Sequence, residues 1–116
     1  LVAGQGHGGI VQGLGQAMGE HAIFEEESGQ LINGSYMDYH MPRADEFPNL
    51  DLDFNEEAQC TTNMLGAKGC GEAGTVASTT AYVNAVYDAL SEYNFKELDM
   101  PITPMKVWKI INNKLI

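Results

Sequence analysis

The chain has 116 residues, enough for one domain with a modest hydrophobic core. Its 16 acidic and 6 basic residues give a net charge of −10, which argues against nucleic acids and anionic membranes as partners because both need a basic surface. No apolar run approaches the ~20 residues of a membrane span, and no signal-peptide pattern is present, so we expect a cytoplasmic protein. The chain begins at Leu1 instead of Met, and we expect it to be a piece of a longer polypeptide.

The first segment is expected to be a glycine-rich loop followed by a helix. Residues 4–9 read GQGHGG, which is typical of a loop. Apolar residues then recur at steps of three and four, which predicts an amphipathic helix. Glycines inside a helix each cost about 1 kcal/mol relative to alanine. Their presence indicates close packing against another backbone, and a chain this short is not expected to offer that surface. The apolar stripe consists of Ile10, Val11, Leu14, Ala17, Met18 and Ala22, and the helix glycines are Gly13, Gly15 and Gly19.

Three strands are predicted next. Residues 21–26 and 31–39 flank a turn at residues 27–30, which predicts a β-hairpin. Residues 41–48 contain two prolines and are expected to be irregular. Residues 49–56 alternate apolar and polar side chains, which predicts a third strand.

A second glycine-rich loop, residues 66–74 (GAKGCGEAG), precedes a predicted helix over residues 75–90. Residues 91–96 form a polar break. Thr103 is a natural N-cap and Pro104 suits the first helical position, so a short third helix is expected to end near Asn112 and Asn113. This order of elements predicts an α+β fold, with a small mixed sheet and three helices.

The second loop is the strongest candidate for a functional site. Its four glycines let another molecule approach the backbone closely, and the N-terminus of the following helix favours negative charge. Glu72, set among these glycines, can serve as a general base if a proton donor lies within reach. The plainer interpretation is a tight turn with a solvated glutamate.

No metal site is expected from the chain's own side chains. The three histidines are scattered, and ten residues separate Cys60 from Cys70, which matches no common zinc spacing. Two cysteines are too few for a disulfide framework. A bond between them stays open, and we favour small buried hydrophobic residues.

Five motifs in register resemble the C-terminal part of the large subunit of molybdenum hydroxylases, the family of xanthine dehydrogenase, aldehyde oxidase and carbon monoxide dehydrogenase. The resemblance covers nearly the whole chain. It is carried by residues 4–17 (GQGHGGIVQGLGQA), 34–39 (GSYMDY), 41–45 (MPRAD), 68–74 (KGCGEAG) and 98–108 (LDMPITPMKVW).

The resemblance implies that residues 1–116 are a C-terminal segment of a molybdopterin-binding domain. The parent enzyme would hydroxylate an aldehyde or an N-heterocycle such as a purine, with oxygen from water. Glu72 would be the general base that takes a proton from the molybdenum-bound hydroxyl. Residues of the second loop would hold the pterin through backbone groups, and Gln5 would hydrogen-bond the cofactor. These loop residues are Lys68, Gly69, Cys70 and Gly71.

The resemblance also implies partners. Electrons would leave through 2Fe-2S clusters and FAD on other domains or subunits, and residues 41–45 resemble bacterial members with a cytosine-dinucleotide pterin. The sequence departs from the family pattern in two places: residues 61–64 (TTNM) replace Thr-Pro-Asn-Pro, and Cys70 stands where an aliphatic residue is common. Because the other molybdenum-proximal residues lie outside this chain, the fragment alone is expected to be inactive and to bind little cofactor.

Two other functions stay open from the residues alone. One is a stand-alone anion- or nucleotide-binding module, although neither a Gly-x-x-x-x-Gly-Lys-Ser/Thr loop nor a strand-led Gly-x-Gly-x-x-Gly is present. The other is a subunit-contact module without catalysis. If Gln5 and Glu72 serve one cofactor, the two glycine-rich segments must converge, with both helix N-termini facing one site. Exposed apolar faces would favour self-association of the isolated chain.

Overall fold

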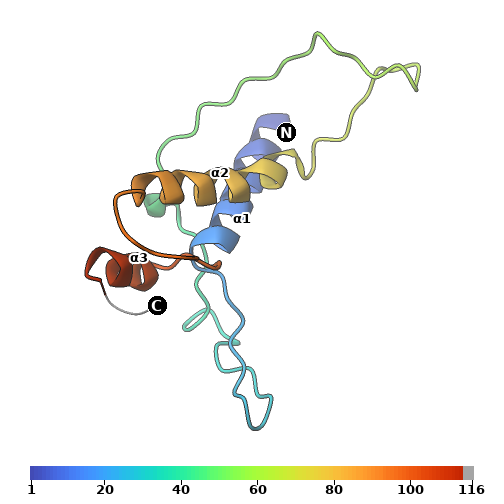
Figure 1. The fold of residues 1–116 in the computed structure, drawn as a ribbon. Coiled ribbons are helices and arrows are strands. Elements are labelled where there is room, and N and C mark those ends of the chain that lie inside the picture. The colour runs from blue at the N-terminus through green and yellow to red at the C-terminus, as the bar shows by residue number, and fades with distance from the viewer. Residues whose placement is uncertain (114–116) are drawn as a thin grey trace.

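The computed structural model describes residues 1–113 and contains three α-helices and one 3₁₀ turn. Helix α1 spans Val2–Met18, α2 spans Ala73–Ala89 and α3 spans Pro104–Ile111, while η1 is the 3₁₀ turn Ala44–Glu46. Figure 1 shows α1 crossing α2, with α3 beside them and two long arms of irregular chain leaving this helical centre.

The predicted mixed sheet is wrong. Within residues 1–113 no strand forms, and the predicted hairpin is reduced to one antiparallel bridge between Phe24 and Leu31. A two-stranded hairpin is marginally stable without a third strand or a packed face, and Phe24 is 58% exposed. Residues 49–56 have no regular secondary structure, and no neighbouring strand in the described chain supplies hydrogen bonds to them. The turn at residues 27–30 is present, with Gly29 at a φ of +70°.

The first glycine-rich segment is also corrected, because it is helical instead of a loop. Helix α1 begins at Val2 and runs through Gly4, Gly6 and Gly9 without a break, ending at Met18. Tertiary packing routinely overrides low helix propensity, and here the missing side chains admit a second helix. A Cβ at Gly9 would lie 3.2 Å from the Gly74 Cα atom.

Of the three glycines predicted to pack against another backbone, one does so and two pack against side chains, and all of these partners lie within this chain. Gly13 faces α2, Gly15 faces Pro42 and Gly19 faces His40. The expectation that the chain offers no such surface is therefore wrong.

The remaining helices follow the sequence closely. Helix α2 begins two residues earlier than predicted and ends one residue earlier. Thr103 caps α3, its hydroxyl oxygen accepting a hydrogen bond from the Lys106 N–H, and Pro104 is the first helical residue. The hydrophobic core lies between the C-terminal half of α2 and α3, where the Ile102 N–H also donates to the Ala17 carbonyl at the end of α1. Its buried residues are Leu90, Leu98, Ile102 and Ile110.

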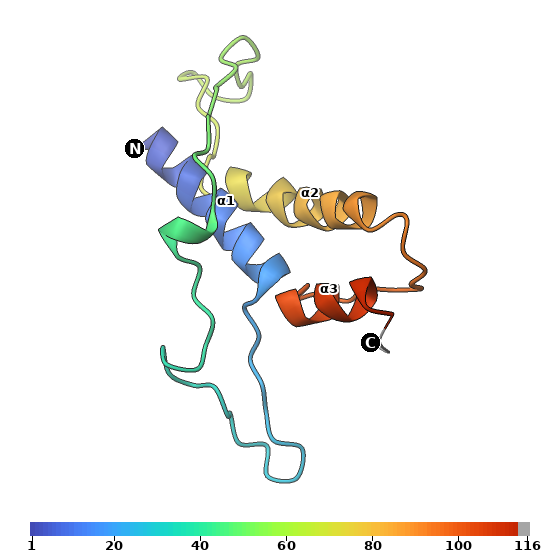
Figure 2. The ribbon, with the colours of Figure 1, turned by 90° about the vertical axis from the view of Figure 1, so that its left-hand side faces the viewer.

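The chain is far from globular. Its radius of gyration is 18.0 Å and its principal extents are 55 × 39 × 28 Å, whereas a compact chain of this length would have a radius of about 13 Å. Figure 2 shows the reason: residues near 30 and near 60 lie at the ends of two arms that project away from the helices in opposite directions.

Candidate functional site

Asn63 organises the loop that leads into α2. Its side-chain oxygen accepts hydrogen bonds from the N–H groups of Leu65 and Ala67, at 3.1 and 3.0 Å, while its Nδ2 donates to the Ala67 carbonyl at 3.0 Å. The Cys60 N–H donates to the Gly66 carbonyl across the turn, and Gly66 has a φ of +64°, a conformation that glycine adopts without strain. One asparagine thus holds a turn that has little buried surface of its own.

The same turn surrounds the Cys60 thiol with donors. The Thr62 hydroxyl lies 3.0 Å from Cys60 Sγ, and Asn63 Nδ2 donates to the sulfur at 3.3 Å. The hydrogen bond with the Thr62 side chain, followed by one from its backbone, lowers the pKa of the Cys60 thiol below its ordinary value of 9.0. Cys60 and Cys70 are both free thiols, and Cys70 is exposed, so the expectation of a buried Cys70 is wrong.

Residues Lys68 to Cys70 line a groove of about 440 Å³, together with Val2 of α1 and Phe54. The Lys68 ammonium group donates to the Ala58 carbonyl, which ties the loop to the preceding segment. Added Cβ atoms at Gly69 and Gly71 would meet no described heavy atom within 4 Å. The backbone of this loop is therefore open to an approaching molecule.

Gln5 and the second loop meet, although 66 positions separate Gln5 from Gly71. The Gln5 side-chain Nε2 donates to the Gly71 carbonyl at 2.9 Å. Gly71 directly precedes Glu72, which is the N-cap residue of α2. The convergence predicted from the sequence is confirmed, but α2 meets the second turn of α1 instead of its N-terminus, because α1 begins at Val2.

Glu72 is exposed at the start of α2. Its carbonyl accepts hydrogen bonds from the N–H groups of Thr75 and Val76, at 3.0 and 3.1 Å. Within the described residues its carboxylate makes no capping bond, so it stays free for another partner. Neither Gln5 nor Glu72 lines the groove beside Lys68.

Sequence reasoning missed the two threonines that join α2 to α1. The hydroxyls of Thr75 and Thr79 donate to the carbonyls of Gly9 and Gly13. A signal was available: Gly9 and Gly13 are four residues apart in α1, and the two threonines are four apart in α2, which places each pair on one helix face.

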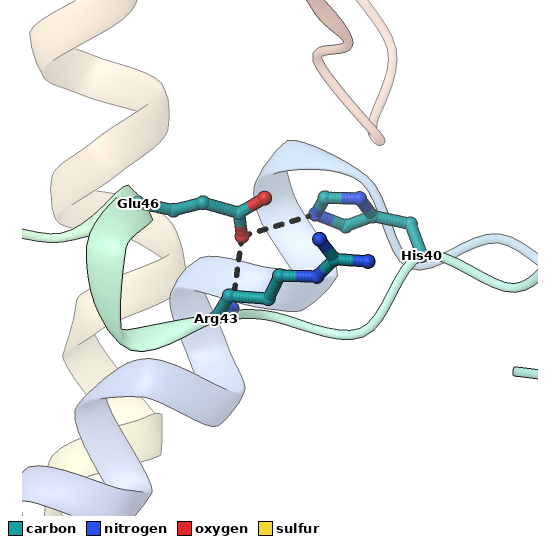
Figure 3. Close-up of polar contacts among 3 residues, drawn as sticks. All are labelled: His40, Arg43 and Glu46. Carbon is teal, nitrogen blue, oxygen red and sulfur yellow. Dashed lines mark hydrogen bonds and ion pairs between the residues drawn. The ribbon is translucent and has the colours of Figure 1, made fainter.

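A polar cluster of His40, Arg43 and Glu46 lies in the chain around η1 (Figure 3). The Glu46 carboxylate accepts a hydrogen bond from the Arg43 N–H at 3.0 Å and lies 3.5 Å from His40 Nε2. Nearby, the Tyr39 hydroxyl donates to Glu20 at 2.9 Å, and this bond to a carboxylate raises the pKa of Tyr39 above 10.0. The cluster shapes the chain around η1.

Among residues 1–113, no group of three or more His, Cys, Asp or Glu side chains is placed to hold a metal ion. No described helix combines the length and apolar character needed to cross a membrane.

Comparison with known proteins defines the class to which this chain belongs. Residues 1–48 match the family described as the molybdopterin cofactor-binding domain. The chain is 40% identical over 105 residues to the 6-hydroxypseudooxynicotine dehydrogenase complex subunit gamma of Paenarthrobacter nicotinovorans, covering 90% of this chain and 13% of that protein. It is 36% identical over 109 residues to the carbon monoxide dehydrogenase large chain of Hydrogenophaga pseudoflava, covering 94% and 13%.

Solved structures agree with these relatives. Quinoline 2-oxidoreductase from Pseudomonas putida 86 superposes with a TM-score of 0.83 at 33% identity, over 98% of this chain and 14% of that one. The chain therefore belongs to the molybdenum hydroxylase family and corresponds to part of its large subunit. It spans about 13% of the length of the curated relatives that it matches.

Proposed function

We propose that residues 1–116 are a C-terminal segment of a molybdopterin-binding domain, in a subunit that hydroxylates an aldehyde or an N-heterocycle with oxygen from water. The observation that carries the proposal is the contact between Gln5 and Gly71, which brings the two glycine-rich segments together beside Glu72. The relatives 6-hydroxypseudooxynicotine dehydrogenase and quinoline 2-oxidoreductase support the N-heterocycle class.

The open backbone of the second glycine-rich loop fits a molybdenum–pterin group. Gly69 and Gly71 are open on the side where a Cβ would stand, so backbone N–H and C=O groups are accessible to pterin nitrogens and oxygens. The N-terminus of α2 adds a partial positive charge, which suits a phosphate. In this proposal Lys68, Gly69, Cys70 and Gly71 hold the pterin, and the Gln5 side-chain oxygen accepts a hydrogen bond from the cofactor.

Glu72 is the proposed general base. Its carboxylate is exposed at the N-cap of α2, beside the loop that would hold the cofactor. There a carboxylate oxygen takes the proton from the oxygen nucleophile derived from water. When bound, the molybdenum–pterin group supplies the two-electron acceptor for oxidation of the substrate carbon.

The remaining parts of the proposal concern the rest of the protein. We propose a cytosine-dinucleotide form of the pterin, 2Fe-2S and FAD carriers on other domains or subunits, and a cytoplasmic location. Relatives named as a subunit gamma and a large chain support assembly with further subunits.

The test is Glu72→Gln in the full-length parent, which keeps the shape of the side chain and removes the base. Loss of a general base costs roughly 10²–10⁴-fold in rate, so turnover should fall at least a hundredfold while molybdenum content stays unchanged. Glu92→Gln is the matched control, because Glu92 is exposed beyond the C-terminus of α2. Near-normal turnover in a fully metallated Glu72→Gln protein would contradict the assignment.

A further inference from the structure

Three side-chain contacts join α1 to α2 and its preceding loop at regular intervals. Gln5 donates to the Gly71 carbonyl at 2.9 Å, Thr75 to the Gly9 carbonyl at 2.8 Å, and Thr79 to the Gly13 carbonyl at 3.0 Å. In every pair the two residues are 66 positions apart, so the contacts advance along both segments in steps of four. We call this row of contacts the Gln–Thr ladder.

Close approach of the two helix backbones makes the ladder possible. A Cβ added at Gly74 would lie 2.6 Å from the Gly6 carbonyl oxygen, and a Cβ at Gly13 would lie 2.1 Å from the Ser78 hydroxyl oxygen. Gly13 and Ser78 are buried. Small residues at four-residue spacing let helices approach until a short hydroxyl side chain reaches the opposite backbone.

Thr75 connects this interface directly to Glu72. Its N–H donates to the Glu72 carbonyl at 3.0 Å, and its hydroxyl donates to the Gly9 carbonyl at 2.8 Å. A single residue therefore ties the backbone of Glu72 to α1, the helix that carries Gln5.

We propose that Thr75, supported by Thr79, is a positioning residue that fixes the register between α1 and α2 and so the place of Glu72 relative to Gln5. The inference rests on the proposed function of Glu72 as a base. The glycines determine how closely the two helices approach, but backbone contact alone does not prevent α2 from sliding along α1 or rotating about its own axis. Directional hydroxyl–carbonyl bonds remove those two freedoms.

Valine is the informative substitution at position 75, because it keeps the branched shape of threonine and removes only the donor. The Gly9 carbonyl lies in the helix interior and keeps its own intrahelical partner, so Thr75→Val leaves no unpaired acceptor. Thr75→Ser restores the hydroxyl. Thr80→Val is the control, because Thr80 lies on the exposed side of the same helix.

The experiment uses the full-length, metal-loaded enzyme. A misplacement of about 1 Å costs on the order of 10²-fold in rate. We expect Thr75→Val to lower kcat between tenfold and a hundredfold, with KM and the molybdenum content per subunit unchanged. Amide hydrogen exchange over residues 73–76 should be at least about tenfold faster in this variant, since the ladder no longer holds the first turn of α2. Thr75→Ser and Thr80→Val should match the unmodified protein in both readouts.

Three results would overturn the inference: an unchanged kcat and exchange rate in Thr75→Val, a serine variant as impaired as the valine variant, or an equal effect of Thr80→Val. Failure of the proposed function is distinguishable. It would leave Glu72→Gln fully active, whereas failure of the positioning inference alone leaves Glu72→Gln inactive and Thr75→Val normal.

Discussion

Glu72 and Gln5 both lie at the start of α2, but different hydrogen bonds hold them there. Glu72 is positioned by its backbone, through the hydrogen bonds from Thr75 and Val76 to its carbonyl, and its side chain is free. Gln5 is positioned by its side chain, through the bond from Nε2 to Gly71. The arrangement leaves one carboxylate and one amide oxygen available for a ligand at the start of α2.

Cys60 offers a test of the loop geometry at the scale of one residue. Because the Thr62 side chain lowers the pKa of the Cys60 thiol below 9.0, more thiolate is present at pH 8 than for an ordinary cysteine, and the thiolate is the reactive form. Thr62→Val should slow alkylation of Cys60 by iodoacetamide at pH 8 and move its half-maximal rate toward higher pH. Mass spectrometry of the alkylated chain measures this, with Thr61→Val as the control. An identical pH profile in Thr62→Val would contradict the assigned hydrogen bond.

At the scale of elements, the pairing of α1 with α2 depends on glycines that sequence propensity counts as unfavourable. Gly13→Ala places a methyl group 2.1 Å from the Ser78 hydroxyl oxygen in a buried site, and overpacking of this kind costs about 1–3 kcal/mol. Gly4→Ala, in the same helix, meets nothing within 4 Å and should stabilise α1 by roughly 0.5–1 kcal/mol. Urea unfolding followed by circular dichroism measures both. Equal effects of the two substitutions would contradict the close helix contact.

The elements also show how far the sequence predicts this fold. Helices α2 and α3 are predicted almost to the residue, and for α3 the reason is that Thr103 and Pro104 are local signals. The prediction of strands is wrong because a strand needs a neighbouring strand for its hydrogen bonds, and residues 49–56 have none in the described chain. The prediction of a loop at the glycine-rich start of α1 is wrong because the helicity of this segment depends on contacts with α2 and its preceding loop, 66 positions away in the sequence. The convergence of Gln5 and Gly71 follows from the family resemblance, whereas the Thr75 and Thr79 contacts depend on a register that only coordinates give.

At the scale of the whole molecule, the surface is too large for a complete domain. A compact protein of this mass exposes about 6,200 Å², whereas this chain exposes 9249 Å², and the excess is apolar in many places. Met37, Met64 and Leu65 are each more than 90% exposed at or near the ends of the arms. Patches of this kind mark surfaces that contact another polypeptide. In the proposed subunit, the arms are covered by chain beyond these 116 residues.

The most direct test of the account is elemental analysis of molybdenum in the purified full-length protein and in the isolated 116-residue chain. We expect about one molybdenum atom per full-length subunit and none in the isolated chain, because the loop around Gly69 and Gly71 is one wall of a site whose other walls lie elsewhere. A folded full-length protein that contains no molybdenum would contradict the account and favour an anion-binding or subunit-contact module.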